Sequence, residues 1–277
     1  MNSFFNGLVK NIKYINRKMN ASRVGAYAGQ AAFFMFLSLI PLVMLFLSLL
    51  KQFGTESLYI SVSAEEFVPG VISSFFNIYI DEIMDDTKLS LTIVSACVLL
   101  WSASKGIFAI IGGLNSVYEI KEDRGYFYLR FISIFYTVAF VGFLVGALII
   151  MVFGNMLNDM LYSLLPDLKG LVYIISSLRF IIAFVLLVLF FTVMFKSLPS
   201  GKQRFSDQLP GAVITSAGWV SFSILFSFFV DNFSNYANIY GSLTAIIVLL
   251  LWLYVCMYII LLGAEINMYI QETRGKN

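Results

Sequence analysis

Two basic residues stand inside long apolar segments of the sequence, where a charged side chain needs a specific reason to be. Lys105 lies within the apolar segment 89–111, and Arg179 lies within the segment 171–195. A cation in the hydrocarbon core of a membrane is costly unless it meets a partner, water or a ligand. Because the planar guanidinium suits phosphate and carboxylate, an anionic headgroup is a reasonable ligand for Arg179. The alternative is structural pairing, for which Asp231 is the nearest acid by depth.

Other reactive groups are scarce. The chain has no histidine, which is the commonest metal ligand and general base. Cys97 and Cys256 each lie in an apolar run, as buried and inert thiols do. The sequence contains no nucleophile elbow, phosphate-binding glycine loop or metal-ligand cluster, and its short loops hold too few carboxylates for a two-metal nuclease site. We therefore predict a protein that is not an enzyme and uses no metal or cofactor.

Composition places these residues in a membrane protein. Hydrophobic residues make up 60% of the 277 residues and charged residues 12%, and the mean hydropathy is +0.87. A helix of about 20 apolar residues crosses a bilayer core, and the apolar runs here are continuous rather than alternating. The sequence predicts an all-α polytopic protein, a single membrane domain of residues 1–277. Its six transmembrane helices are expected at 26–50, 89–111, 131–153, 171–195, 209–230 and 243–266.

The charges between these segments predict the orientation of the bundle. Lys51, Lys88 and Lys169 fall on one side of the predicted spans. Thirteen basic residues fall on the other side: Lys10, Lys13, Arg17, Lys18, Arg23, Lys121, Arg124, Arg130, Lys196, Lys202, Arg204, Arg274 and Lys276. By the positive-inside rule, both termini are cytoplasmic, including the segment 1–25, which lacks the features of a cleavable signal peptide. The basic loops are what this topology demands, so they do not indicate a nucleic-acid partner.

The predicted orientation places each basic residue of the spans at a depth in the membrane. Lys105 lies ~24 Å from the outer end of its helix at ~1.5 Å per residue, so its ammonium could instead snorkel to the cytoplasmic interface. Glu265 stands at a similar depth near the inner end of segment 243–266, with Asn267 beside it. A contact between Lys105 and Glu265 is geometrically allowed, as a structural clamp or as part of an inner gate.

Two further patterns concern helices. Apolar residues recur at helical spacing after Pro69 and predict an amphipathic outer helix over about residues 68–84, which either covers the bundle as a lid or lies in the outer leaflet. The first eighteen residues could form a similar, basic helix at the inner surface.

Within segment 26–50, Pro41 removes a backbone hydrogen bond and predicts a kink or local unwinding near Ser38. Broken helices mark substrate sites in some transporters, although an ordinary kink is the simpler alternative.

Three stretches of the sequence resemble one family. They are Ala31 to Leu42, Trp101 to Tyr118, and Tyr240 to Asn267, which ends in Leu-Gly-Ala-Glu-Ile-Asn. Their order and spacing are similar to those of the YihY/BrkB family of bacterial inner-membrane proteins. The positions that carry the resemblance are Ser38, Pro41, Trp101, Asn115, Tyr240, Gly241, Glu265 and Asn267. Lys105 falls where relatives often have a basic residue, whereas Arg179 has no place in a family motif.

The resemblance implies a six-helix protein of the bacterial inner membrane whose biochemical role is unsettled. The family has carried a ribonuclease label, which the residues of this chain do not support. We expect a transporter or translocation factor for an anionic or amphipathic substrate such as a lipid, with the bilayer as its partner. The alternative is a non-transporting scaffold for envelope assembly. The candidate residues for substrate binding or gating are Lys105, Asn115, Arg179, Glu265 and Asn267.

Overall fold

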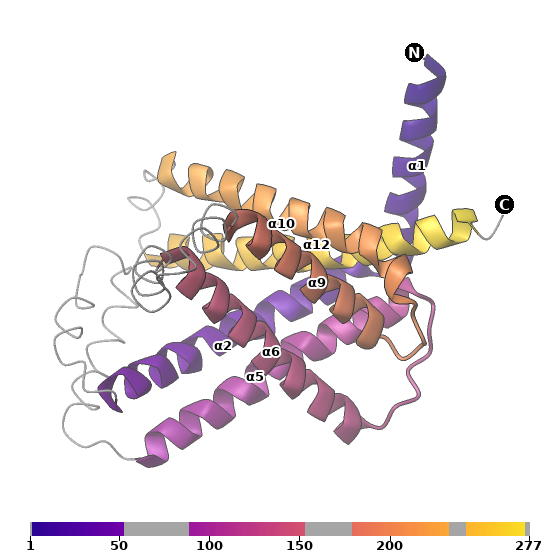
Figure 1. Cartoon of the computed structure of the whole chain (residues 1–277). Helices are drawn as coiled ribbons and strands as arrows, with labels where there is room; N and C mark the ends of the chain where they lie inside the picture. Colours follow the sequence, from indigo (N-terminus) through magenta and orange to yellow (C-terminus); the bar gives the residue numbers. More distant parts are fainter. Residues whose placement is uncertain (1, 53–88, 153–178, 233–241, 275–277) are drawn as a thin grey trace, which may run out of the picture.

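The computed structural model of the protein describes residues 2–52, 89–152, 179–232 and 242–274. These residues form helices joined by loops, without a strand, which confirms the predicted all-α fold class. The helices are α1 (Asn2–Ala21), α2 (Val24–Gln52), α5 (Leu89–Val117), α6 (Tyr126–Val152), α9 (Arg179–Ser197), α10 (Phe205–Asn232) and α12 (Ser242–Arg274) (Figure 1).

Each predicted span overlaps one of these helices. In the described residues, α5, α6, α9, α10 and α12 are long and apolar enough to cross a membrane, and α2 contributes the apolar stretch Val24–Leu39. The chain is therefore an all-helical membrane protein. The predicted outer helix at 68–84 lies outside the described residues.

The helix α5 continues past the predicted end of its span. It runs to Val117, and Gly112 and Gly113 let it pack closely there: a Cβ on Gly113 would lie 2.9 Å from the side chain of Leu261 on α12. Beyond Val117, Glu119 adopts a left-handed φ of 54°, and the N–H of Ile120 donates to the carbonyl of Asn115 at 2.8 Å. This pattern is a Schellman motif, which satisfies carbonyls at the end of a helix.

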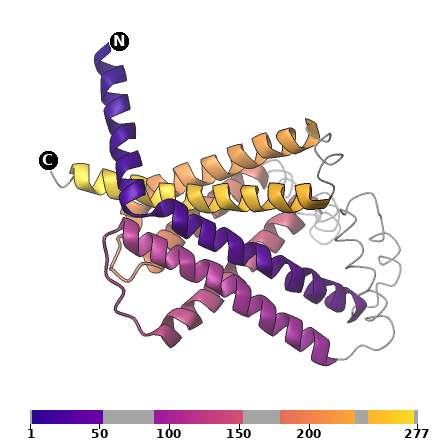
Figure 2. The ribbon, with the colours of Figure 1, turned by 180° about the vertical axis from the view of Figure 1, so that it is seen from behind.

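The described helices form a bundle. The helix α5 packs along α2 and also contacts α6 and α12, and α12 further contacts α1, α2 and α10. The helix α10 lies between α9 and α12. In contrast, α6 crosses α5 obliquely (Figure 1). The helix α1 touches α2 and α12 and then extends sideways from the bundle, as the view from behind also shows (Figure 2).

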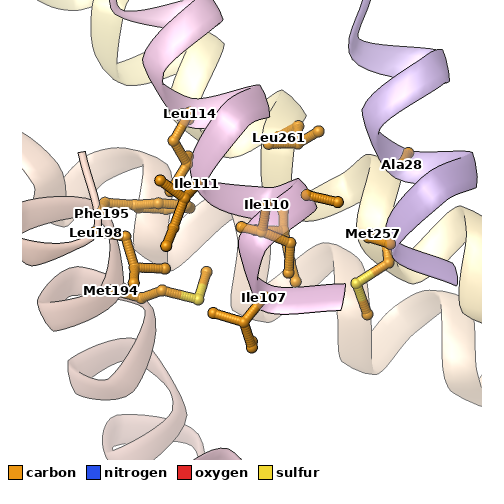
Figure 3. Packing of buried hydrophobic residues seen from close by; sticks show 14 of the residues in the cluster. Ala28, Ile107, Ile110, Ile111, Leu114, Met194, Phe195, Leu198, Met257 and Leu261 are labelled. Atoms are coloured by element: carbon orange, nitrogen blue, oxygen red, sulfur yellow. The ribbon is translucent and has the colours of Figure 1, made fainter. Parts of the chain in front are cut away.

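Both ends of the described chain lie at the same end of the bundle, together with the loops 118–125 and 198–204. We call this the inner end, because the predicted basic side of the protein falls there. The buried core lies near it: Ile107, Ile110 and Leu114 of α5 face residues of α9 and α12 (Figure 3). Ala28, Ala31 and Ala32 of α2 are fully buried, and such small residues let membrane helices approach closely.

The structure decides one of the two outcomes predicted for Pro41. The helix α2 remains helical from Val24 to Gln52, so local unwinding does not occur. The hydroxyl of Ser38 is buried and donates to the carbonyl of Met35 at 2.6 Å, one turn before the proline. The donor of the Ser38 hydroxyl is therefore used within its own helix.

Candidate functional site

Two cations meet at one tryptophan within the predicted membrane span. Nζ of Lys105 lies 5.8 Å from the ring centroid of Trp101 and 5.1 Å from that of Phe34 on α2. Cζ of Arg130 lies 4.1 Å from the Trp101 centroid, and its Nη2 donates to the Trp101 carbonyl at 2.7 Å. We call Phe34, Trp101, Lys105 and Arg130 the Trp101 cluster. It joins three helices, α2, α5 and α6.

Neither cation of the Trp101 cluster forms an ion pair with a carboxylate in the described part of the chain. The ion pairs found there are Lys18–Glu119, Lys18–Glu272, Arg124–Glu122 and Arg274–Asp207. Arg130 is only 8% exposed, and its Nε has no hydrogen-bond partner among the described residues. Cation–π contacts contribute ~0.5–2 kcal/mol each, which is less than the several kcal/mol that burying an ion costs. The cluster is therefore an electropositive site with spare donor capacity.

Arg130 is the functional candidate that sequence reasoning missed. It precedes the predicted span 131–153 and was therefore assigned to the basic loop. The structure starts α6 at Tyr126, so Arg130 lies more than one turn inside the helix, and its guanidinium contacts Trp101 of α5. The aromatic residues Tyr126, Phe127 and Tyr128 could have signalled this, because aromatic belts mark where helices enter a membrane.

Asn267 ties two helices together at the inner end. Its fully buried amide accepts a hydrogen bond from the N–H of Gly211 at 2.6 Å and donates to the carbonyl and Oε1 of Gln208 at 3.1 and 3.0 Å. Tyr118 donates to the same Oε1 at 2.5 Å. Burial raises the pKa of the Tyr118 hydroxyl, so it stays a donor at neutral pH. All these bonds are internal, so the arrangement is structural.

The same two helices cross very closely beside Asn267. A Cβ added to Gly211 of α10 would lie 2.1 Å from the carbonyl oxygen of Gly263 on α12. A Cβ on Gly263 would lie 1.8 Å from Oγ1 of Thr215. Only glycine permits this approach of backbone to backbone, which we call the glycine crossing.

Asn115 connects the two loops of the inner end. Its Nδ2 donates to Oε2 of Glu122 at 2.7 Å, and its Oδ1 accepts from the N–H of Ser200 at 2.9 Å. Arg124 binds both carboxylate oxygens of Glu122, at 2.8 and 2.7 Å, and also donates to the carbonyl of Leu198. The Arg124 guanidinium lowers the pKa of Glu122 to about 2. Asn115 therefore holds loops together.

Glu265 does not meet Lys105. It is 1% exposed, and its Oε2 has no hydrogen-bond partner in the described residues. The charges that act on it belong to Lys18, Glu272 and Glu119 at the inner end, whereas Lys105 turns toward Phe34 and Trp101. The allowed contact between Lys105 and Glu265 is absent because the two side chains leave their helices toward different neighbours.

Three predicted site residues are not placed in full. Arg179 is the first residue of α9, and its side chain lies outside the description, as does that of its proposed partner Asp231. Tyr240 and Gly241 lie outside the described residues. The Trp101 cluster is thus the site whose geometry the structure gives.

A bundle of long apolar helices with charged side chains within its spans defines a polytopic α-helical membrane protein. The chain belongs to the family described as Virulence factor BrkB, whose model matches residues 15–277. This confirms the resemblance seen in the sequence.

Known relatives cover nearly the whole chain. It is 30% identical over 258 residues to the Putative ribonuclease-like protein YfkH of Bacillus subtilis, covering 91% of this chain and 94% of that protein. It is 29% identical over 274 residues to UPF0761 membrane protein PBPRA3489 of Photobacterium profundum, covering 95% and 81%. A UPF0761 membrane protein of Coxiella burnetii is 26% identical over 273 residues, covering 95% and 94%. No solved structure matches the chain at a significant level.

Proposed function

We propose that the protein is a transporter or translocation factor that moves an anionic, amphipathic substrate, such as a lipid, across the bacterial inner membrane. The observation that carries the proposal is the Trp101 cluster. Its two cations share one indole, and neither forms an ion pair with an acid of the described residues. Two like charges in a medium of low polarity repel each other, and each also loses hydration when it is buried. An anion bound between them offsets both the repulsion and the lost hydration.

The surroundings of the cluster favour a substrate with an apolar part. Trp101 is 54% exposed, and exposed apolar side chains continue along α5 and α6 on both sides of it, including Val98, Phe131 and Phe135. In a membrane this surface meets acyl chains. A phosphate headgroup at Lys105 and Arg130 would place its chains along these residues, because guanidinium and ammonium groups both bind phosphate.

Orientation forms part of the proposal. The inner end carries Lys18, Arg124 and the other basic residues of the predicted cytoplasmic side, so we place both termini in the cytoplasm. The substrate then moves between the leaflets past α5 and α6. Accessibility of single cysteines introduced at residues 13 and 202 to a membrane-impermeant thiol reagent tests this placement: labelling should require permeabilised cells.

The transport proposal is tested in proteoliposomes with fluorescent phosphatidylglycerol, and with fluorescent phosphatidylcholine for comparison. Reduction of the outward-facing dye by dithionite reports movement between leaflets. Wild-type protein should accelerate movement of the anionic lipid, and Lys105→Gln should slow it about tenfold, the effect of losing ~1.4 kcal/mol of interaction. Lys196→Gln is the matched control, because Lys196 also lies over an aromatic ring, 5.9 Å from the Phe205 centroid, but at the exposed inner end.

Two results would overturn this function. Movement no faster than in empty liposomes, with the protein folded, would favour the scaffold that the sequence leaves as its alternative. Equal rates for Lys105→Gln and wild type would remove the Trp101 cluster from the mechanism.

The proposal contains no catalytic step, so we expect no ribonuclease activity. The name of the relative YfkH, a putative ribonuclease-like protein, suggests ribonuclease activity for that relative. Purified protein incubated with end-labelled RNA should leave the RNA intact. Cleavage that co-purifies with the protein through two chromatography steps would contradict the expectation.

A further inference from the structure

The carboxyl group of Glu265 is the buried ionisable group that the proposed function leaves unused. It belongs to α12, is 1% exposed, and makes no hydrogen bond through Oε2 within the described residues. A carboxylate in such a place loses its hydration without replacement, so the ionised form is strongly disfavoured. A protonated carboxyl is neutral and avoids most of this cost.

The charges around Glu265 have both signs: Lys18 favours the ionised carboxylate, whereas Glu272 and Glu119 disfavour it. Of the elements packed against α12, α1 contributes Lys18, and the residues after α5 contribute Glu119 and Tyr118. Glu272 comes from α12 itself, and no charged group of α2 or α10 is among those that act on Glu265 in the described chain. The set therefore contains two carboxylates that disfavour ionisation of Glu265 and one ammonium that favours it.

The one ammonium in this set is already engaged. Nζ of Lys18 lies 2.7 Å from Oε1 of Glu119 and 3.0 Å from Oε1 of Glu272. Tyr14 of α1 donates to the other oxygen of Glu272 at 2.5 Å. We call these four residues the Lys18 latch, which fastens α1 to α12 and to the loop 118–125. While the latch is closed, Lys18 does not bind Glu265.

We propose that Glu265 is a proton-binding site at the inner end of the bundle, controlled by the Lys18 latch. With the latch closed, the Glu265 carboxyl holds a proton. When Lys18 leaves Glu119 and Glu272 and approaches Glu265, the O–H bond breaks, the proton passes to water at the inner end, and the carboxylate pairs with the ammonium. Closing the latch reverses both steps.

This inference gives the proposed transporter an energy source, and that part rests on the proposed function. Movement of the anionic substrate toward one side would be coupled to one proton that binds and leaves at Glu265. The proton site itself is independent of transport and can be examined in purified protein.

Infrared spectroscopy across a pH titration tests the site directly. Wild-type protein should show the carbonyl band of a protonated carboxyl at neutral pH, and Glu265→Gln should lack it. The amide mimics the neutral carboxyl in size and charge, so this variant should fold normally. Spectra of wild type and Glu265→Gln that coincide in this region at every pH would overturn the inference.

Reaction with dicyclohexylcarbodiimide gives a second measurement, because this apolar reagent attacks protonated carboxyl groups. Mass spectrometry should find the adduct at Glu265 and not at Glu272. Replacing both latch acids, Glu119→Gln with Glu272→Gln, frees Lys18 and should lower the labelling of Glu265 about tenfold, the change expected when the carboxylate gains ~1.4 kcal/mol of interaction with the ammonium. Asp207→Asn is the control, because Asp207 is an inner-end acid outside the latch, 4.0 Å from Arg274. Unchanged labelling in the double variant would remove the latch from the proposal.

The two proposals fail in different ways. A protonated Glu265 in a protein that moves no lipid leaves the proton site standing and overturns transport. Lipid movement that ignores both an imposed pH gradient and Glu265→Gln overturns proton coupling and leaves transport standing.

Discussion

The inner end and the Trp101 cluster treat charge in opposite ways. At the inner end, Arg124 binds both oxygens of Glu122, and Lys18 binds two carboxylates. In the Trp101 cluster, Lys105 and Arg130 meet aromatic faces, and Arg130 keeps an unpartnered Nε within the described residues. Charges that are paired hold a structure together, whereas charges left unpaired in an apolar setting mark a place where something else binds. Under the proposed function, the Arg124–Glu122 pair belongs to the framework and the Trp101 cluster to the substrate site, while Glu265 is an inner-end group whose Oε2 has no partner in the described residues.

The largest expected effect is at the framework, in the glycine crossing. Gly211→Ala places a Cβ 2.1 Å from a backbone oxygen that cannot move without displacing α12. We expect a loss of about 3 kcal/mol or more, or failure to fold. The control is Gly142→Ala on α6, where a Cβ meets nothing within 4 Å. Thermal unfolding in detergent should separate the two variants, and equal unfolding temperatures would show that the helices do not cross this closely.

Asn267→Ala should have the next largest effect. It removes the bonds to Gly211 and Gln208, so the buried N–H of Gly211 loses its side-chain acceptor, at a cost of about 2 kcal/mol. Lipid movement, measured at a temperature where the variant is folded, should stay close to wild type. A folded variant that has lost transport would show that Asn267 takes part in transport, and would contradict its assignment to the structural part of the inner end.

Acid should weaken the inner end through Glu122. Its pKa is lowered from an ordinary 4.5 to about 2, mainly by the hydrogen bonds from Arg124. The stabilisation is therefore full above pH 4.5 and is lost as pH falls toward 2, an effect on the order of 2 kcal/mol. Unfolding temperatures measured across this range should fall more steeply for wild type than for Glu122→Gln. Parallel curves would contradict the ion pair.

The smallest effect on stability, and the most diagnostic, is expected at the Trp101 cluster. Lys105→Gln removes an unpaired cation, so the variant should be as stable as wild type in zwitterionic detergent, or about 1 kcal/mol more stable. Added phosphatidylglycerol should raise the unfolding temperature of wild type and of Lys196→Gln, but not that of Lys105→Gln. Equal stabilisation of all three would show that the lipid binds elsewhere.

Hydropathy predicted the helical class and a span that overlaps each of α2, α5, α6, α9, α10 and α12, because it depends on composition averaged over about 20 residues. It did not predict which way a side chain leaves its helix. Lys105 and Glu265 have similar depths, yet one faces Phe34 and the other faces the inner end near Lys18. Depth follows from counting along a sequence, whereas rotation about the helix axis is set by packing against neighbours.

Arg130 illustrates the same limit for helix crossing. Its position beside an apolar segment is visible in the sequence, but its contact with Trp101 depends on the oblique path of α6 over α5. Asn115 and Asn267 are predicted from the sequence as gating or binding residues. In the structure their amides are occupied by loop and helix partners.

The glycine crossing also limits how this bundle can change shape. The backbones of α10 and α12 touch at this crossing, and Asn267 forms hydrogen bonds across it. We therefore expect the two helices to move together as one rigid unit. If the protein alternates between inward-open and outward-open forms, as the proposed transport requires, we expect the motion between α5 and α6, which cross obliquely, and not within the α10–α12 pair. The helix that moves would then be α6, which carries Arg130 of the Trp101 cluster.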